Sequence, residues 1–507
     1  MRIMNSMIDQ APTGRFFSFD NSYARLPESF YVRLSPTPVK NPQLIQLNDS
    51  LAHELNLEPK DFLTTEGTEI LAGNRIANGS EPLAMAYAGH QFGNFVPQLG
   101  DGRAILLGEV LDRNGRRRDI QLKGSGPTPY SRRGDGRSAI GPVLREYLIS
   151  EAMAALGVPT TRALAAVTTG ELVWRDIPLP SAILTRTAAS HIRIGTFQFF
   201  AARGDKEMIK ILADYAIDRH YPEVKEAANP YRCFLDCLIQ RQAKLVAQWS
   251  HIGFIHGVMN TDNTSIAGET IDYGPCAFMD TYHPATVFSS IDRQGRYSYA
   301  NQPVIAKWNL MRLAEALLPL LANDTAKAIN EAQEALDTFN SRFESANTLG
   351  LLNKIGLPNG SDEDLTLAQD LLKRMADQKA DFTLTFRRLC DLADSADDQK
   401  GDTSARSLFA NPLAFDDWAM KWRKRLSEDN IDPAMRREAM SRVNPSFIPR
   451  NHLVEEAITA AIESEDFSVF KALLGVLTKP FDVCPKCNRY TKPPLPDQVV
   501  HQTFCGT

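Results

Sequence analysis

The stretch 98–137 combines residue types that chemistry on a polyphosphate requires. It holds a glycine turn at Gly100 and Gly102, a lysine at Lys123, and a second glycine-rich run with several arginines at 132–137. A triphosphate needs backbone N–H groups and cations at close range, and glycines let the backbone approach because they carry no side chain. Either G-x-G pair alone would indicate an ordinary turn. Together with the lysine and the arginines, the two pairs predict a nucleotide site.

A second group of residues, 256–275, offers a base and metal ligands. Asp262 and Asn263 are adjacent, and Asp272 opens an Asp-Tyr-Gly tripeptide. Transfer chemistry on phosphates needs a carboxylate that accepts the proton of the attacking hydroxyl, and oxygen ligands that hold Mg²⁺. Adjacent Asp-Asn is common in turns, so this pair alone would carry little weight. Downstream of the lysine, it predicts Asp262 as the base and Asn263 and Asp272 as metal ligands.

A β-hairpin is predicted to position the lysine. Residues 104–110 are an apolar run, and residues 119–123 alternate between polar and apolar side chains. Because side chains alternate across a strand, the apolar ones share one face and Lys123 lies on the other. The dipeptide Asn114-Gly115 supplies the turn, since both residues tolerate positive φ.

Further elements follow this hairpin. A helix is predicted over 142–156 from its proline near the start and the glycine and proline just after its end, and it carries Glu146. Gly170 is predicted to form the turn between two short strands, 163–169 and 171–175.

The order of glycine loop, strand lysine and helix glutamate resembles the small lobe of a protein kinase, in which lysine and glutamate pair to position the phosphates. One departure stands out. Kinases carry an aspartate soon after the histidine of their catalytic loop, whereas His256 is followed here by Gly257 and Val258. Asp262 would then have to be the base, immediately before the metal-binding Asn263. Ordinary transfer of the γ-phosphoryl group is therefore disfavoured.

Four long motifs resemble the selenoprotein O (SelO/YdiU) family, and the likeness covers nearly the whole chain. They are GHQFGNFVPQLGDGRA, QLKGSGPTPYSRRGDGRSAIGPVLREYLISEAM, RTAASHIRIGTFQFF and HGVMNTDNTSIAGETIDYGP. The resemblance implies a pseudokinase that binds ATP in a flipped orientation and transfers AMP to Ser, Thr or Tyr hydroxyls of proteins. It also implies UMP transfer from UTP when Mn²⁺ is available.

The resemblance also implies roles for individual residues. Asp262 matches the proton acceptor, Asn263 and Asp272 match the ligands of Mg²⁺ or Mn²⁺, and Glu146 matches the residue that orients Lys123. The implied nucleotide-binding residues are Gly100, Gly102, Arg103, Lys123, Asp135, Gly136, Arg186, Arg193 and Asp272.

The expected fold class is α+β, with a kinase-like β-rich small lobe, a helical large lobe and extensions at both ends. We expect an N-terminal extension over 1–80 packed on the small lobe, the small lobe over 81–200 and the large lobe over 201–330. A helical part over 331–480 and a cysteine-containing tail over 481–507 follow.

Two other functions compete with AMP transfer. One is a catalytically silent ATP-binding regulator, and the other is a true protein kinase. Retention of Lys123, Asp262, Asn263 and Asp272 argues against the first, because a silent scaffold needs neither base nor metal ligands. The apolar Val258 argues against the second.

Composition limits the partners and the location. The formal net charge of −5 argues against general nucleic-acid binding, and no apolar run approaches the ~20 residues that span a bilayer. The N-terminal stretch has no apolar core typical of a secretory signal, and the seven cysteines are scattered. We therefore expect a cytoplasmic protein with neither nucleic acid nor membrane as a partner.

The cysteines of the tail allow several interpretations. Cys484, Cys487, His501 and Cys505 have a spacing that could bind zinc. The resemblance instead gives Cys505 a redox role, because some relatives carry selenocysteine near the C-terminus. Cys276, just after the Asp-Tyr-Gly motif, could pair with Cys505 under oxidation and gate nucleotide access. A redox Cys505 ranks first, zinc second, and incidental cysteines third.

Overall fold

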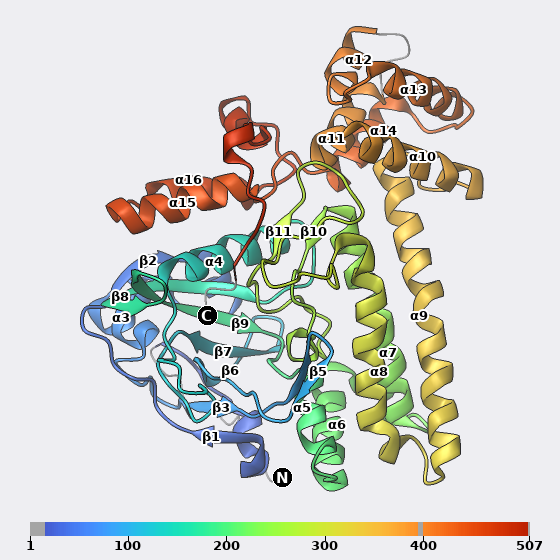
Figure 1. Ribbon diagram of the computed structural model, residues 1–507. Helices are drawn as coiled ribbons and strands as arrows, with labels where there is room; N and C mark the ends of the chain where they lie inside the picture. Colours follow the sequence, from blue (N-terminus) through green and yellow to red (C-terminus); the bar gives the residue numbers. More distant parts are fainter. Residues whose placement is uncertain (1–15, 394–398, 505–507) are drawn as a thin grey trace, which may run out of the picture. The chain divides into compact units, whose positions relative to one another are not determined.

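The computed structural model describes residues 16–393 and 399–504. It contains an extended β-sheet and many helices, which confirms the α+β class (Figure 1). The chain divides into two compact units. The first comprises the described residues up to Tyr87, Gln98–Val143 and Thr161–His191, and the second comprises Ala88–Pro97, Leu144–Thr160 and the chain from Ile192 onward.

The first unit is built on a seven-stranded sheet in which all neighbouring strands are antiparallel. Its strand order is β1-β3-β6-β7-β9-β8-β2 (Figure 1). The strands are β1 (Tyr31–Arg33), β2 (Gln43–Leu47), β3 (Leu83–Met85), β6 (Ala104–Leu111), β7 (Arg117–Lys123), β8 (Arg162–Trp174) and β9 (Pro178–Ala188). The predicted N-terminal extension thus contributes β1 and β2 to the same sheet that contains Lys123.

The predicted hairpin is confirmed as β6 and β7. Ile120 and Leu122 are fully buried, and both belong to the apolar core of the unit. The turn differs in one detail from the expectation. Gly115 has a φ of +71°, but Asn114 stays outside the left-handed region, and its N–H instead donates to the buried carboxylate of Asp112. One glycine is therefore enough to reverse the chain here.

The prediction of a turn at Gly170 is wrong. β8 runs without a break through Gly170, and the chain reverses between Trp174 and Pro178. Gly170 has a φ of +69° and lies where the register between β8 and β9 shifts. An added Cβ would come within 2.7 Å of Asn41. The glycine therefore marks a bulge, which sequence alone does not distinguish from a turn.

Short helices complete the core of the first unit. These are α1 (Asp49–Glu54), α2 (Pro59–Phe62) and α3 (Thr65–Ala72). Asn48 and Thr64 cap α1 and α3 by accepting backbone N–H groups. Phe62 and Leu51 pack in one apolar cluster with Leu122. This burial fixes which face of β7 points inward, so that the side chains of the opposite face remain for the site.

The second unit contains a short β4–β5 hairpin and most of the helices. The chain enters this unit at Ala88 and returns to it within α4 (Ile140–Ala155). α4 confirms the predicted helix. The other elements up to residue 354 are β4 (Gly89–Gln91), β5 (Asn94–Val96), α5 (Ile194–Ala201), α6 (Lys206–His220), α7 (Pro230–His251), β10 (Phe254–Ile255), β11 (Ala277–Phe278), α8 (Gln302–Leu321) and α9 (Thr325–Lys354). The helices α7, α8 and α9 pack along one another (Figure 1).

The chain after residue 354 is also helical, as predicted. It forms α10 (Asp362–Gln378), α11 (Phe382–Leu392), α12 (Gln399–Arg406), α13 (Pro412–Ser427), α14 (Pro433–Val443), α15 (Asn451–Ser464) and α16 (Ser468–Leu477). Two stacked tryptophans, Trp418 and Trp422, centre the core of this part, and Nε1 of Trp422 donates to the carbonyl of Ile355. Within the described ranges, no helix is both long and apolar enough to cross a bilayer.

Candidate functional site

The first unit brings the two glycine-rich stretches together. Gly100 has a φ of +81°, and a Cβ there would lie 2.3 Å from the ring of Tyr130. A Cβ on Gly102 would lie 2.8 Å from the carbonyl oxygen of Tyr130. The hydroxyl of Thr128 donates to the carbonyl of Asp101 over 2.7 Å. Both glycines are therefore required, because the second stretch crosses directly over the first.

The second glycine-rich stretch also contains a position that only glycine fits. Gly136 has a φ of +64°, and an added Cβ would overlap the backbone of Gly126 at 2.1 Å. Its neighbour Asp135 accepts hydrogen bonds from the guanidinium of Arg175, with 2.8 and 3.2 Å between the atoms. Burial alone would raise the pKa of Asp135, but these bonds and the N–H of Arg137 hold it below its ordinary value. Asp135 thus has an ion-pair partner that the sequence did not indicate.

The polar face of β7 forms a hydrogen-bond network. Gln121 donates to Oδ2 of Asp101 over 3.1 Å and accepts from Nε of Arg186 over 2.7 Å. Arg186 stands directly opposite Gln121 in the register of β7 and β9, and it is only 2% exposed. The network links a predicted nucleotide-binding arginine to the glycine turn. Strand alternation placed Gln121 on this face, but its role was not predicted.

Lys123 and Arg103 lie at the same end of this sheet. Lys123 is the last residue of β7, opposite Ala104 of β6 and Leu184 of β9. The carbonyl of Arg103 accepts the N–H of Gly124 over 2.7 Å. The lysine is thereby held beside the glycine turn, as the sequence predicted.

The second unit positions Asp262 in a short 3₁₀ turn, η4 (Thr261–Asn263). The β4–β5 hairpin lies against it. Nε2 of Gln91 donates to Oδ2 of Asp262 over 3.3 Å, and a Cβ on Gly89 would lie 2.6 Å from Oδ1. The N–H of His90 donates to the hydroxyl of Thr261 over 2.7 Å. The hairpin therefore fixes both the turn and its carboxylate, and neither Gly89 nor Gln91 was predicted to belong to the site.

The carboxylate of Asp262 is buried and only partly hydrogen-bonded. It is 7% exposed, and Oδ1 is buried without a hydrogen-bond partner among the described residues. Burial raises the pKa of Asp262 to about 6, although the charge of Arg193 opposes the rise. A carboxylate with such a pKa is ionised at neutral pH yet basic enough to accept a proton.

Arg193 joins the two acidic segments. Its Nη1 donates to the backbone carbonyl of Asp262 over 3.0 Å and lies 3.0 Å from Oδ2 of Asp272. The side chain is 3% exposed, and the residue caps the start of α5. The predicted contact of Arg193 with the nucleotide remains a prediction. The contacts found here make it a clamp between Asp262 and Asp272.

Asp272 has a backbone conformation that few non-glycine residues adopt. Its φ is +61°, and the N–H of Gly274 donates to its carbonyl. Nε2 of the buried His256 lies 2.9 Å from the carbonyl oxygen of Ile271, which precedes Asp272. Burial lowers the pKa of His256, so its ring is neutral near pH 7. Strained backbone of this kind persists where the surrounding structure holds it in place.

The predicted metal ligands have a donor set that suits Mg²⁺. Nδ2 of Asn263 donates to the carbonyl of Val258 over 2.9 Å, which leaves Oδ1 as the acceptor of that amide. No group of three His, Cys, Asp or Glu residues that could hold a metal occurs in the described part of the chain. Mg²⁺ commonly uses one or two protein oxygens together with phosphates and waters, so an Asn-Asp pair fits it.

Glu146 and Cys276 are also buried in the second unit. The pairing of Glu146 with Lys123 remains a prediction. Cys276 is a free thiol. Cys505 lies outside the described residues, so its redox role and its pairing with Cys276 also remain predictions. The nearby Thr503 is described, and its hydroxyl donates to the carbonyl of Pro275 over 2.5 Å.

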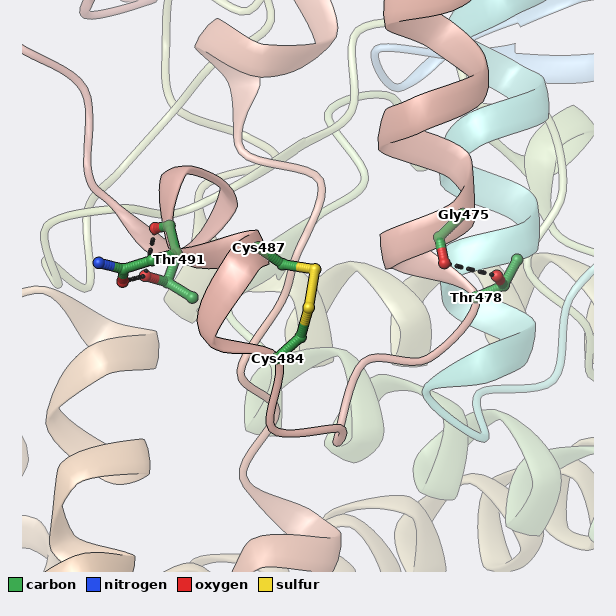
Figure 2. The surroundings of a disulfide bond; sticks show 6 residues. Gly475, Thr478, Cys484, Cys487 and Thr491 are labelled. Carbon is green, nitrogen blue, oxygen red and sulfur yellow. Dashed lines mark hydrogen bonds between the residues drawn. A yellow bond between two sulfur atoms is a disulfide. The ribbon is translucent and has the colours of Figure 1, made fainter.

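The zinc interpretation of the tail is wrong for this structure. Figure 2 shows Cys484 and Cys487 joined to each other in a disulfide, in the short turn that follows α16. A sulfur in a disulfide has no thiolate to offer a metal. His501 is exposed and has no metal partner in the described tail.

Comparison with known proteins decides the family. The family model described as protein adenylyltransferase SelO matches residues 16–478. A protein nucleotidyltransferase YdiU from Methylorubrum extorquens is 62% identical over 494 residues, covering 97% of this chain and 99% of its own. Relatives of the same name from a Bradyrhizobium species and from Rhizobium rhizogenes are each 60% identical, over 97% and 96% of this chain and 99% and 97% of their own.

The chain belongs to the SelO family. As a member of the SelO family it is an enzyme of the nucleotidyltransferase class. The family match runs through both units, and it includes every residue predicted to act in catalysis, nucleotide binding or Mg²⁺ binding.

The contact between Gly89 and Asp262 generates a prediction. Replacing Gly89 with Ala inserts a methyl group 2.6 Å from Oδ1, so the carboxylate must move. We expect nucleotidyl transfer to fall by roughly tenfold to a hundredfold, because small displacements of a reacting group are costly. Transfer of labelled nucleotide to protein measures the effect.

The matched control is Gly475→Ala on α16, where the added methyl meets open space. This control should transfer at the wild-type rate. Wild-type activity in Gly89→Ala, or a loss accompanied by collapse of its thermal unfolding transition, would contradict the assignment of Gly89.

Proposed function

We propose that this enzyme transfers AMP from ATP to Ser, Thr or Tyr hydroxyls of proteins and releases pyrophosphate. The main observation is Asp262, a nearly buried carboxylate with a raised pKa and one oxygen without a partner among the described residues. Membership in a family of adenylyltransferases supports the choice of AMP as the transferred group. The names of the relatives support protein as the acceptor.

We further propose that the fold is kinase-like. The seven-stranded sheet with Lys123 serves as the small lobe, and the helices with Asp262 and Asp272 serve as the large lobe. The predicted boundaries stay as proposals: an extension over 1–80, the small lobe over 81–200, the large lobe over 201–330, a helical part over 331–480 and a tail over 481–507.

The reaction assigns one proton transfer to Asp262. The acceptor oxygen attacks the α-phosphorus, its proton passes to the carboxylate of Asp262, and the bond to the bridging oxygen of pyrophosphate breaks. Arg193 keeps the carboxylate ionised before the reaction, because its positive charge opposes the rise in the pKa. Gln91 orients the same group through its hydrogen bond to Oδ2.

Cations and backbone groups bind the phosphates in this proposal. Lys123 is assigned to the phosphates and Glu146 to its orientation. The remaining nucleotide-binding residues are Gly100, Gly102, Arg103, Asp135, Gly136, Arg186, Arg193 and Asp272. Asn263 and Asp272 would hold Mg²⁺ or Mn²⁺, which offsets the charge of the triphosphate and of the departing pyrophosphate. Transfer of UMP from UTP with Mn²⁺ and a cytoplasmic location are also proposed.

Label transfer distinguishes this function from its alternatives. We expect ATP labelled on the α-phosphate to mark protein in the presence of Mg²⁺ or Mn²⁺, and ATP labelled on the γ-phosphate to leave it unmarked. Asp272→Ala should abolish the label, since it removes a metal ligand. Gel autoradiography under reducing conditions measures both labels.

Label from the γ-position alone would instead establish a protein kinase. Absence of both labels, with acceptor proteins and either metal present, would establish the silent regulator.

The raised pKa of Asp262 predicts the pH dependence. Below about pH 6 the carboxylate is protonated and cannot accept a proton, so kcat/KM should fall as the pH drops through this range and level off above it. Measuring transfer between about pH 5 and pH 8 gives the midpoint.

Gln91→Leu distinguishes titration of Asp262 from titration of the nucleotide's phosphates. The hydrogen bond from Gln91 lowers the pKa of Asp262, so its loss should move the midpoint to higher pH. An unchanged midpoint in this variant would show that another group titrates.

A further inference from the structure

The second unit contains a cavity of about 650 Å³ between α7 and α9. Residues just after α4, at the end of α14 and just after α16 complete its lining. The apolar lining residues include Leu156, Val158, Leu349 and Phe481. Cavities of this size bind small organic molecules. The lining residues lie outside the segment 256–275 that holds Asp262 and Asp272, so the cavity is separate from the proposed chemistry.

The charged groups on the lining are all basic. Lys244, Arg342, Lys354 and Arg442 line the cavity, and its described lining contains neither Asp nor Glu. His251 also lines it, but burial lowers the pKa of His251 to about 4, so that ring is neutral near pH 7. Basic side chains around a partly apolar space favour an anion over a neutral or cationic molecule.

Two of these cations already have acidic partners. Nη2 of Arg342 lies 3.8 Å from Oδ1 of Asp236, and Nη2 of Arg442 pairs with Oε1 of Glu438. Among the described residues, neither Lys244 nor Lys354 forms an ion pair with a carboxylate. Lys354 is buried whereas Lys244 is exposed to solvent, so Lys354 is the group that a bound anion would stabilise most.

Of the two lysines, Lys354 gives the stronger evidence for an anion site. It is the last residue of α9, its side chain is 2% exposed, and Nζ lies 4.3 Å from the ring centroid of Phe386 and 5.4 Å from that of Phe382. Burial lowers the pKa of Lys354 to about 7. A buried lysine without a carboxylate destabilises a fold unless something pairs with it. Aromatic faces offset only part of that cost.

We propose that this cavity binds a small amphipathic anion. Its apolar body occupies the space between α7 and α9, and its acidic group pairs with Lys354 and Lys244. The polar side chains of Ser345 and Asn353 also line the cavity and provide hydrogen-bond donors for the same acidic group. A bound anion would touch His251 and Ile252, which one residue, Gly253, separates from β10 and the segment with Asp262.

Two probes that differ only in charge test the proposal. One is 8-anilino-1-naphthalenesulfonate, and the other is N-phenyl-1-naphthylamine, the same fluorophore without its sulfonate. Fluorescence titration of the intact protein gives the affinity and the stoichiometry of each. We expect one saturable site for the sulfonate and at least about tenfold weaker binding of the neutral amine, since a buried ion pair separates them.

Variants locate the site. Lys354→Met keeps the side-chain volume and removes an unpaired buried charge, so it should fold. We expect it to weaken binding of the sulfonate about tenfold and to leave binding of the amine unchanged. Leu349→Trp should narrow the cavity and weaken binding of both probes by at least about tenfold. Leu349 is 54% exposed, so the larger side chain does not disturb the core.

Ile329→Trp is the matched control, because Ile329 lies on the same helix, is 50% exposed and does not line the cavity. It should bind both probes as the wild type does. If Lys354→Met does not fold, Lys244→Gln replaces it, with the same selective loss expected for the sulfonate. Equal affinities for the two probes, no saturable site, or unchanged binding in Leu349→Trp would each overturn the proposal.

Discussion

The clamp that Arg193 forms between Asp262 and Asp272 is the interaction on which the rest of the site depends. A carboxylate removed from water tends to stay protonated, and burial raises the pKa of Asp262 accordingly. The positive charge of Arg193 limits that rise, while its hydrogen bond holds the backbone of the same residue. One side chain therefore opposes protonation of the proposed base and holds its backbone, and it also forms an ion pair with Asp272.

Local patterns in the sequence predicted the elements that carry the site. Alternation over residues 119–123 assigned Lys123 and Gln121 to one face of β7, and the burial of Ile120 and Leu122 confirms it. Glycine turns and the predicted helix near Glu146 followed in the same way. These features depend on residues close together in the sequence, so a single sequence is enough to predict them.

The contacts that tune the site join residues far apart in the chain, and no periodicity encodes them. Gln91 reaches Asp262 across 171 positions, and Arg186 reaches Gln121 across 65. Gly170 was misread because a bulge and a turn both place glycine at positive φ. The residue pattern predicted the base and the metal ligands, and the family resemblance added the roles of most nucleotide-binding residues. The matching family model supports that resemblance over both units.

The most direct test compares the stability of the wild type with that of Asp262→Asn at several pH values. It asks whether ionisation of Asp262, the proposed base, lowers the free energy of unfolding. The native carboxyl titrates at about 6 and the unfolded one near 4, so this cost is fully present above pH 6 and disappears below pH 4. Two pKa units correspond to about 3 kcal/mol. We expect Asp262→Asn to unfold at a higher temperature than the wild type at about pH 8, and the difference to shrink toward about pH 4. A variant that is less stable at the higher pH, or a difference that does not change with pH, would contradict this expectation.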